Sequence, residues 1–192
     1  MKGLSGKAVL VTGGGGAIGS AICTRFAEAG ATLLVADVNE ESCKKTARAV
    51  NGKALVFDIS KYDEAKKAIG SETVDILVNN AGWDRFQNFL DTSPAEWDQL
   101  LDINLRGPLN MHHIVVPQMM KRGSGRVINI SSDAGRTVYP GLAVYSASKF
   151  FVVTISTLVA ALARVTDHVF SKSSLSMKTG ECVVIKIGPS WA

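Results

Sequence analysis

The chain has 192 residues, of which 46% are hydrophobic and 20% charged, and its net charge is +4. This balance is that of one globular domain and excludes collagen-like and low-complexity chains. The charge is modest and no dense Lys/Arg run occurs, so we expect no nucleic-acid partner. Cys23, Cys43 and Cys182 are widely separated and odd in number, which argues against a disulfide framework and a metal site.

The chain opens with a strand–turn–helix–strand pattern. An apolar strand over residues 8–11 leads through Thr12 to a run of glycines, a helical pattern covers residues 18–29, and a second apolar strand covers residues 32–36. Strands that are apolar almost throughout are typical of a parallel sheet with both faces covered. The predicted fold class is therefore α/β.

The glycine turn after the first strand suits a pyrophosphate. Glycines allow a phosphate to approach the backbone closely, and the start of the following helix offers free N–H groups and a positive dipole end. Gly13, Gly15 and Gly19 fit the spacing G-x-G-x-x-x-G rather than the commonest dinucleotide fingerprint. We expect this turn to bind the phosphates of a dinucleotide.

Asp37 stands at the end of the second strand, 18 positions beyond Gly19. A carboxylate there accepts hydrogen bonds from the ribose hydroxyls of an adenosine and repels a 2′-phosphate. Neither Val38 nor Asn39 supplies a cation for such a phosphate. These residues favour NAD over NADP; the alternative role for Asp37 is to cap the helix that begins near Glu40.

Two more strands and two helices are predicted next. A strand over residues 54–57 ends at Asp58, a short helix covers residues 61–69, and a strand over residues 74–78 ends in Asn79-Asn80-Ala81-Gly82. A long helix then runs from about Ser93, past Asn104, toward Lys121.

The composition of this long helix predicts both its start and a break. Thr92 or Ser93 serves as N-cap, with Pro94 in the first turn and Glu96 three residues after Ser93. Gly107 and Pro108 should kink or split its middle.

The fifth strand, over residues 125–130, ends at Ser131-Ser132, and a loop leads to a helix that carries Tyr145 and Lys149. Positions i and i+4 share one face of a helix, so the phenol and the ammonium share one site. A cation beside a tyrosine favours the phenolate and lowers its pKa from about 10, which makes a general acid/base. These polar groups stand at the carboxyl ends of strands, where open α/β sheets bind ligands.

In these residues the chain resembles the short-chain dehydrogenase/reductases. The likeness comprises Thr12-Gly13, Ala17, Gly19, Asp37, Asp58, Asn79-Asn80-Ala81-Gly82, Asn104 in Asn-Leu-x-Gly, Ser132 and Tyr145-x-x-x-Lys149. Ser132 precedes Tyr145 by 13 positions, the family's usual spacing. The resemblance implies a Rossmann-like, doubly wound parallel sheet in a single domain.

The resemblance also implies roles for individual residues. Tyr145 would exchange the proton at the substrate oxygen, Lys149 would lower its pKa and bind the nicotinamide ribose, and Ser132 would hydrogen-bond the substrate oxygen. Asn104 would support the lysine and a proton-relay water, or cap backbone groups near Pro108. The residues implied for NAD binding are Thr12, Gly13, Gly15, Ala17, Ile18, Gly19, Asp37, Asp58, Ile59, Asn80, Ala81, Gly82, Tyr145 and Lys149.

The substrate is expected to be a small molecule. The stretch from Asn79 to Asp84, with Met111-His112-His113 and Ser132-Asp133-Ala134, is similar to 2-hydroxycyclohexanecarboxyl-CoA dehydrogenases and related hydroxyacyl-CoA enzymes. Trp83 and Asp84, with Ser132, are the expected substrate residues, although Trp83 suits a simple loop anchor equally well. The alternative is a 3-oxoacyl carrier protein reductase, against which Asp37 argues because those enzymes usually prefer NADP.

The resemblance stops after about Ala163. We expect a dinucleotide-binding catalytic domain over residues 1–163 and a divergent tail over residues 164–192, without the family's usual last strand and substrate lid. The apolar run at 182–187 is read either as a substitute strand or as part of a truncated or frame-shifted tail. In the second case the protein would be a catalytically weak nucleotide-binding protein.

The remaining expectations concern compartment and assembly. The N-terminus has no apolar signal-peptide core, and the longest apolar stretch, Phe150 to Ala163, is too short to span a bilayer. A cytoplasmic protein without a membrane partner is therefore predicted. Family members commonly form tetramers through the long helices near Asn104 and Tyr145, which implies a homo-oligomer.

Overall fold

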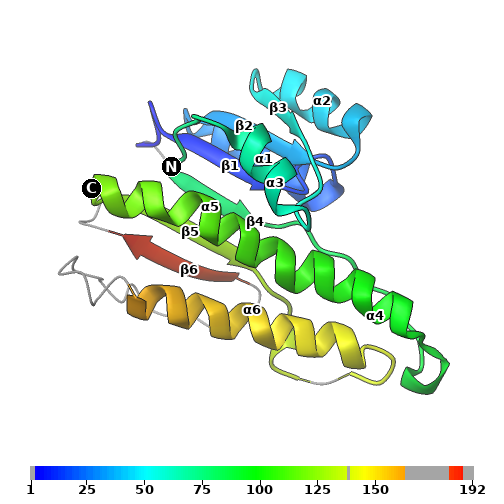
Figure 1. Ribbon diagram of the computed structural model, residues 1–192. Helices are drawn as coiled ribbons and strands as arrows, with labels where there is room; N and C mark the ends of the chain where they lie inside the picture. Colours follow the sequence, from blue (N-terminus) through cyan, green and yellow to red (C-terminus); the bar gives the residue numbers. More distant parts are fainter. Residues whose placement is uncertain (1–2, 138, 163–181, 188–192) are drawn as a thin grey trace.

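The computed structural model describes residues 3–137, 139–162 and 182–187. They form a six-stranded sheet in the order β3-β2-β1-β4-β5-β6, with helices on both faces (Figure 1). The elements are β1 (Ala8–Thr12), α1 (Ala17–Glu28), β2 (Thr32–Asp37), α2 (Glu40–Ala49), β3 (Lys53–Val56), α3 (Tyr62–Ile69), β4 (Ile76–Asn79), η1 (Phe89–Asp91), α4 (Pro94–Leu101), η2 (Asp102–Arg106), α5 (Gly107–Arg122), β5 (Gly125–Ile130), η3 (Asp133–Gly135), α6 (Ala143–Leu162) and β6 (Cys182–Ile187).

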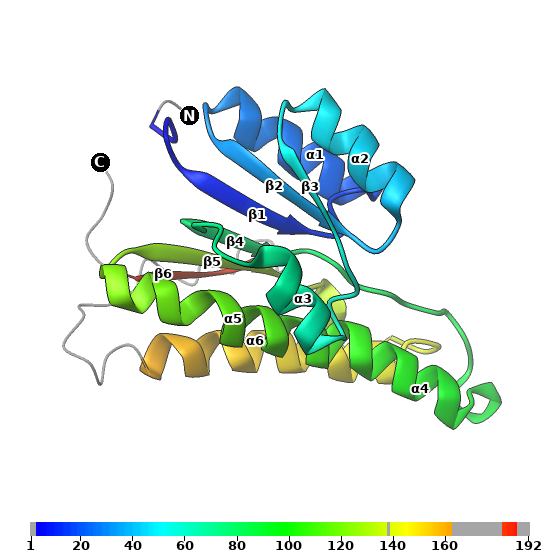
Figure 2. The same cartoon turned by 45° about the horizontal axis from the view of Figure 1, so that its top comes forward.

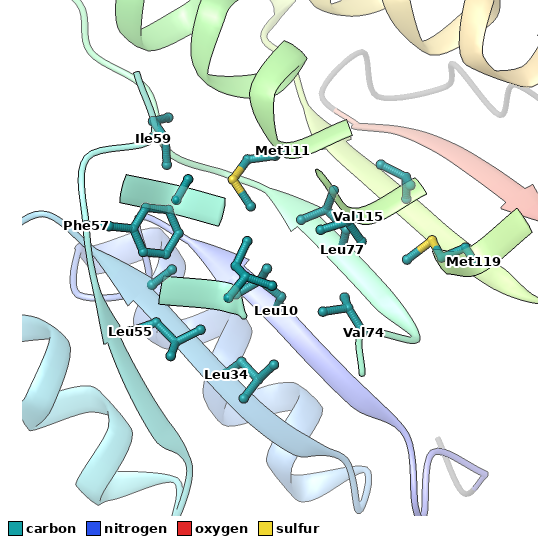
Figure 3. Close-up of a cluster of buried hydrophobic side chains, with 14 of the residues drawn as sticks. Leu10, Leu34, Leu55, Phe57, Ile59, Val74, Leu77, Met111, Val115 and Met119 are labelled. Atoms are coloured by element: carbon teal, nitrogen blue, oxygen red, sulfur yellow. The ribbon is translucent and has the colours of Figure 1, made fainter. Parts of the chain in front are cut away.

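Side chains of each buried strand alternate between two hydrophobic cores. In β1, Val9 and Val11 face α1 and α2, whereas Leu10 faces the side that carries α3, α5 and α6. Figure 2 shows these two helical layers on opposite faces of the sheet. Figure 3 shows the second core, where Met111, Val115 and other side chains pack around Leu10. The apolar strands thus have both faces covered by helices, as a parallel sheet requires.

The parallel strands β1 to β5 all end at one edge of the sheet. β1 pairs with β2 on one side and with β4 on the other, so the strand order reverses at β1. In open α/β sheets, ligands bind at the carboxyl edge beside such a reversal. The topology therefore brings the ends of β1, β2 and β4 to one place, together with the polar residues that follow them.

Most predicted elements are present, with shifted ends. β3 covers Lys53–Val56 rather than 54–57, and β4 covers Ile76–Asn79 rather than 74–78. The short helix α3 begins at Tyr62, with Lys61 as its N-cap. Apolar content does not determine these ends, because pairing with the neighbouring strand sets where a strand begins.

The long predicted helix is split, as Gly107 and Pro108 indicated. Ser93 and Glu96 form a capping box at the start of α4, and a five-residue π-helical segment, η2, joins α4 to α5. Pro108 has no N–H to donate to the carbonyl of Asn104, four residues earlier, so the regular α-helical ladder is interrupted there. Asn104 is buried inside this segment.

The apolar run at 182–187 forms β6, which pairs antiparallel with β5. This is the substitute strand considered from the sequence, although its direction opposes that of every other strand. On the α1 side of β5, Ile128 and Ile130 are only partly buried. The remainder of the tail, including Gly188-Pro189, lies outside the described residues.

None of the helices in the described ranges has the length and apolar character needed to cross a bilayer.

Candidate active site

A cavity of about 620 Å³ opens at the carboxyl ends of β1 and β4. Its lining contains most of the residues expected to bind NAD. These are Gly13, Ala17, Ile18, Gly19, Asp37, Ile59, Asn80, Ala81 and Gly82. Five further lining residues were not predicted from the sequence: Gly16, Val38, Phe57, Gln99 and Ile103. Val38 follows Asp37 and Phe57 precedes Asp58 in the sequence. Their position next to these two motif residues could have identified them as lining residues.

The glycine turn has the close packing that its residue types suggested. Gly13 has φ 63°, and a Cβ at this position would lie 2.9 Å from Cα of Ala81. A Cβ on Gly19 would overlap the carbonyl oxygen of Gly13. Gly16 is the N-cap of α1, and no side chain in the described part of the chain caps this helix start. The first amides of α1 therefore remain available to an anion, and the turn fits a dinucleotide phosphate.

Asp37 links the end of β2 to the glycine turn. Its Oδ2 accepts a hydrogen bond from the backbone N–H of Gly15 at 2.9 Å, and its Oδ1 accepts one from Asn39 at 2.9 Å. The alternative role as helix N-cap is wrong, because Asn39 caps α2 through the amide of Ser42. Asp37 also lines the cavity, so its half-exposed carboxylate faces the space for a ligand.

Thr12 and Asn80 join β1 to the segment after β4. The Thr12 hydroxyl accepts hydrogen bonds from the backbone N–H groups of Asn80 and Ala81, each at 3.1 Å. The Asn80 side chain donates to the Thr12 carbonyl at 3.0 Å and to the Gly13 carbonyl at 3.3 Å. Thr12 and Gly15 thus shape the cavity without lining it. Asp58 also does not line it, and its carboxylate accepts from the N–H of Ser60.

Tyr145, Lys149 and Ser132 meet beside this cavity. The Lys149 ammonium lies 5.5 Å from the centre of the Tyr145 ring, and the Ser132 side chain hydrogen-bonds to Tyr145. Lys149 is only 6% exposed, and its Nζ donates to the Ile130 carbonyl at 3.3 Å. A Cβ on the cavity residue Gly82 would lie 3.4 Å from the same Nζ. The predicted acid/base group therefore adjoins the predicted cofactor site.

The expected lowering of the Tyr145 pKa by Lys149 is not found. Burial raises the pKa of Tyr145, the Ser132 hydrogen bond opposes this rise, and the charge of Asp84 adds to it. Burial also lowers the pKa of Lys149, against the opposing charge of Asp84. For both side chains the largest effect is the removal of water from the charged form, which burial disfavours.

Asn104 connects the π-helical segment to the loop after β4 and to α6. Its Oδ1 accepts from the N–H of Trp83 and its Nδ2 donates to the Trp83 carbonyl, both at 2.8 Å. Nδ2 also donates to the Ser148 hydroxyl at 3.1 Å, which in turn donates to the Tyr145 carbonyl at 2.6 Å. Asn104 thus contacts backbone and serine groups around Tyr145 and Lys149.

Trp83 lines the site, and Asp84 follows it on the surface. Trp83 lines both the large cavity and a narrow pocket of about 20 Å³ that Tyr145 also lines. Asp84 is exposed and acts electrostatically on both Tyr145 and Lys149. The two hydrogen bonds from Asn104 to the Trp83 backbone also hold the loop in place. Trp83 can therefore anchor its loop and still face a substrate.

The two adjacent histidines of α5, His112 and His113, lie in different environments. His112 is 5% exposed, and its Nδ1–H donates to the Pro108 carbonyl at 2.6 Å. His113 lies 2.9 Å, through Nδ1, from the Tyr62 hydroxyl on α3. Within the described part of the chain, no three His, Cys, Asp or Glu side chains are grouped as metal ligands.

Known proteins share this architecture. The family model for short chain dehydrogenases matches residues 7–167. The chain is 41% identical over 159 residues to a glycine betaine reductase of Emericella nidulans, covering 78% of this chain and 12% of that protein. It is 34% identical over 160 residues to the 3-oxoacyl-[acyl-carrier-protein] reductase of Thermotoga maritima, covering 78% of this chain and 65% of that protein.

Solved structures agree with these relatives. The 3-oxoacyl-[acyl-carrier protein] reductase of Brucella melitensis with bound NAD superimposes with a TM-score of 0.77 at 31% identity, over 82% of this chain and 65% of that one. The chain therefore spans less than two thirds of the length of each of these three relatives. By the match over residues 7–167 and by its fold, the chain belongs to the short-chain dehydrogenase/reductase family.

Proposed function

We propose that this protein is an NAD(H)-dependent oxidoreductase that interconverts a secondary alcohol and a ketone. The observation that carries the proposal is the meeting of Tyr145, Ser132 and Lys149 beside the cavity of the glycine turn. A proton-transfer group next to a dinucleotide site is what hydride transfer at a carbinol carbon requires.

Each polar group has a task in this reaction. Bound NAD(H) supplies or accepts the hydride at the carbinol carbon. In the reducing direction Tyr145 donates its phenolic proton to the substrate oxygen, and Ser132 donates a hydrogen bond to the same oxygen as negative charge develops there. Lys149 holds positive charge beside the phenol and binds the nicotinamide ribose. Asn104 positions Trp83 and the start of α6 around them.

Asp37 supports NAD rather than NADP. Its carboxylate faces the cavity and is held by the amide of Gly15, so a 2′-phosphate placed there would be repelled. We expect Asp37→Ala to narrow the preference for NADH over NADPH, measured as the ratio of dissociation constants. Glu41→Gln, which removes an exposed acid of α2, should leave that ratio unchanged.

A hydroxyacyl-CoA thioester is the proposed substrate class, on the likeness of the segment from Asn79 to Asp84. The second candidate is a 3-oxoacyl thioester on carrier protein, favoured by the identity to the Thermotoga maritima reductase. Because a solved reductase of that kind carries NAD, a preference for NAD does not separate the two. Turnover of one 3-oxoacyl chain attached either to CoA or to carrier protein distinguishes them.

The test combines cofactor binding with turnover in the purified chain. NADH titration should show binding, and a panel of hydroxyacyl-CoA and oxoacyl-CoA substrates should show turnover. Tyr145→Phe should reduce turnover by about 10²- to 10⁴-fold while NADH still binds. Tyr62→Phe, a tyrosine on α3 paired with His113, is the matched control. Binding without turnover would instead indicate a catalytically weak nucleotide-binding protein, and unchanged turnover in Tyr145→Phe would refute the mechanism.

We also propose a homo-oligomer in the cytoplasm. Leu101, Leu109 and Phe150 are exposed apolar side chains on α4, α5 and α6, the helices expected to meet a second copy. Light scattering coupled to size-exclusion chromatography measures the assembly, and a monomer at micromolar concentration would contradict it.

A further inference from the structure

The loop after β4 carries an exposed carboxylate, Asp84, between residues that line the site. Asn104 clamps the backbone of Trp83 on both sides, which fixes the position of the next residue, Asp84. On the other side, Gly82 approaches the Lys149 ammonium closely. Trp83 and Arg85, the neighbours of Asp84, line the same narrow pocket as Tyr145. Asp84 therefore lies in a segment, residues 82–85, whose other three residues line the large cavity or the narrow pocket.

Among the residues that the structure describes, no neighbouring cation forms an ion pair with this carboxylate. Arg85 forms its ion pair with Glu96 of α4. The Lys149 ammonium is buried and donates to the Ile130 carbonyl, and the charge of Asp84 acts on it without forming an ion pair. Within residues 3–137, 139–162 and 182–187, Asp84 forms no ion pair. Its exposed charge is thus available to a molecule that approaches Tyr145.

We infer that Asp84 is a specificity-determining residue that excludes substrates with a free carboxylate beside the reacting carbonyl and admits their uncharged acyl derivatives. The inference rests on the proposed function and narrows its substrate class. A 3-oxoacyl thioester or amide carries no charge next to the carbonyl, whereas the free 3-oxo acid brings a second negative charge toward Asp84. Two like charges within several ångströms at a protein surface repel each other, which weakens binding of the acid.

The test uses two substrates that differ in charge and hardly in shape. Acetoacetamide and acetoacetate both gain a hydride at the ketone carbon and a proton at its oxygen, and NADH is oxidised to NAD⁺. Wild-type protein should favour the amide in kcat/KM. Asp84→Asn should reduce the amide-to-acid ratio by about tenfold, mainly through faster use of the acid. Asp84→Lys should reduce the ratio further.

Two controls separate charge from structure. Asp98→Asn removes an equal charge from the exposed face of α4 and should leave the ratio unchanged. Raising the salt concentration should weaken the wild-type preference and not that of Asp84→Asn, since only a charge effect is screened. If the wild-type protein reduces both ketones with a ratio that Asp84→Asn does not change, the inference is wrong and the proposed function stands. If neither ketone nor any thioester is reduced, the proposed function is wrong and the inference fails with it.

Discussion

The side chain of Asn104 pairs with the backbone of Trp83 as a neighbouring strand would, accepting from its N–H and donating to its carbonyl at 2.8 Å each. The amide is 2% exposed and uses a further donor on the Ser148 hydroxyl. One residue thereby joins the π-helical segment, the loop after β4 and the first turns of α6. The positions of Trp83, Asp84 and Tyr145 depend on this junction.

We predict that Asn104→Ala lowers both stability and turnover. The change leaves the N–H and carbonyl of Trp83 without their partner, which costs about 1–3 kcal/mol of unfolding free energy. Urea unfolding measures the loss, and kcat at saturating NADH measures the effect on the site. Asn110→Ala is a matched control, because Asn110 also donates to two backbone carbonyls, those of Ile59 and Ser60. Equal losses of kcat in the two variants would argue against a positioning role for Asn104.

Gly19→Ala should weaken NADH binding. The added Cβ overlaps the Gly13 carbonyl, so the glycine turn must open and the phosphate site is displaced. We expect the affinity for NADH to fall by about tenfold or more, because a close-packed backbone cannot accommodate an added Cβ unless neighbouring residues move. NADH fluorescence titration measures it. Ser20→Ala, at the next position of α1, should bind NADH as the wild type does, and normal binding by Gly19→Ala would contradict the site.

The pH dependence of turnover should differ between the two directions. Because burial raises the pKa of Tyr145 above its ordinary value near 10, the phenol stays protonated through the neutral range. Reduction needs the phenol as acid, so its rate should be flat between about pH 6 and 8. Oxidation needs the phenolate, so its kcat/KM should rise about tenfold per pH unit over the same range. A flat oxidation profile would show that the phenol is already ionised there.

His112 should make stability depend on pH. Burial lowers its pKa, while its hydrogen bond to Pro108 opposes this. Between the folded and unfolded pKa values the unfolded chain binds a proton that the folded protein does not, so stability rises with pH. Unfolding free energy should therefore fall as pH drops below about 6.5. Urea titrations at several pH values should show a smaller fall in His112→Gln and the wild-type fall in His113→Gln.

Much of the fold could be predicted from local chemistry. The apolar strands with glycine and acid at their ends predicted a parallel sheet, and Ser93 with Glu96 predicted the start of α4 correctly. Pro108 predicted a break in the long helix because the missing N–H is a property of the residue itself. It did not predict that the break would be a π-helical segment enclosing Asn104, since that shape depends on the bonds to Trp83 and Ser148.

The sequence by itself determined the family, the glycine turn and the residue types of the proposed acid/base group, because motif spacing and backbone chemistry are local. Tertiary structure decided the direction of β6 and the electrostatics around Tyr145. A helical spacing of four places Lys149 on the face of Tyr145, and that part of the prediction is confirmed. The raised pKa of the phenol arises from burial and from Asp84, a residue distant in sequence, and only the packed molecule brings these influences together.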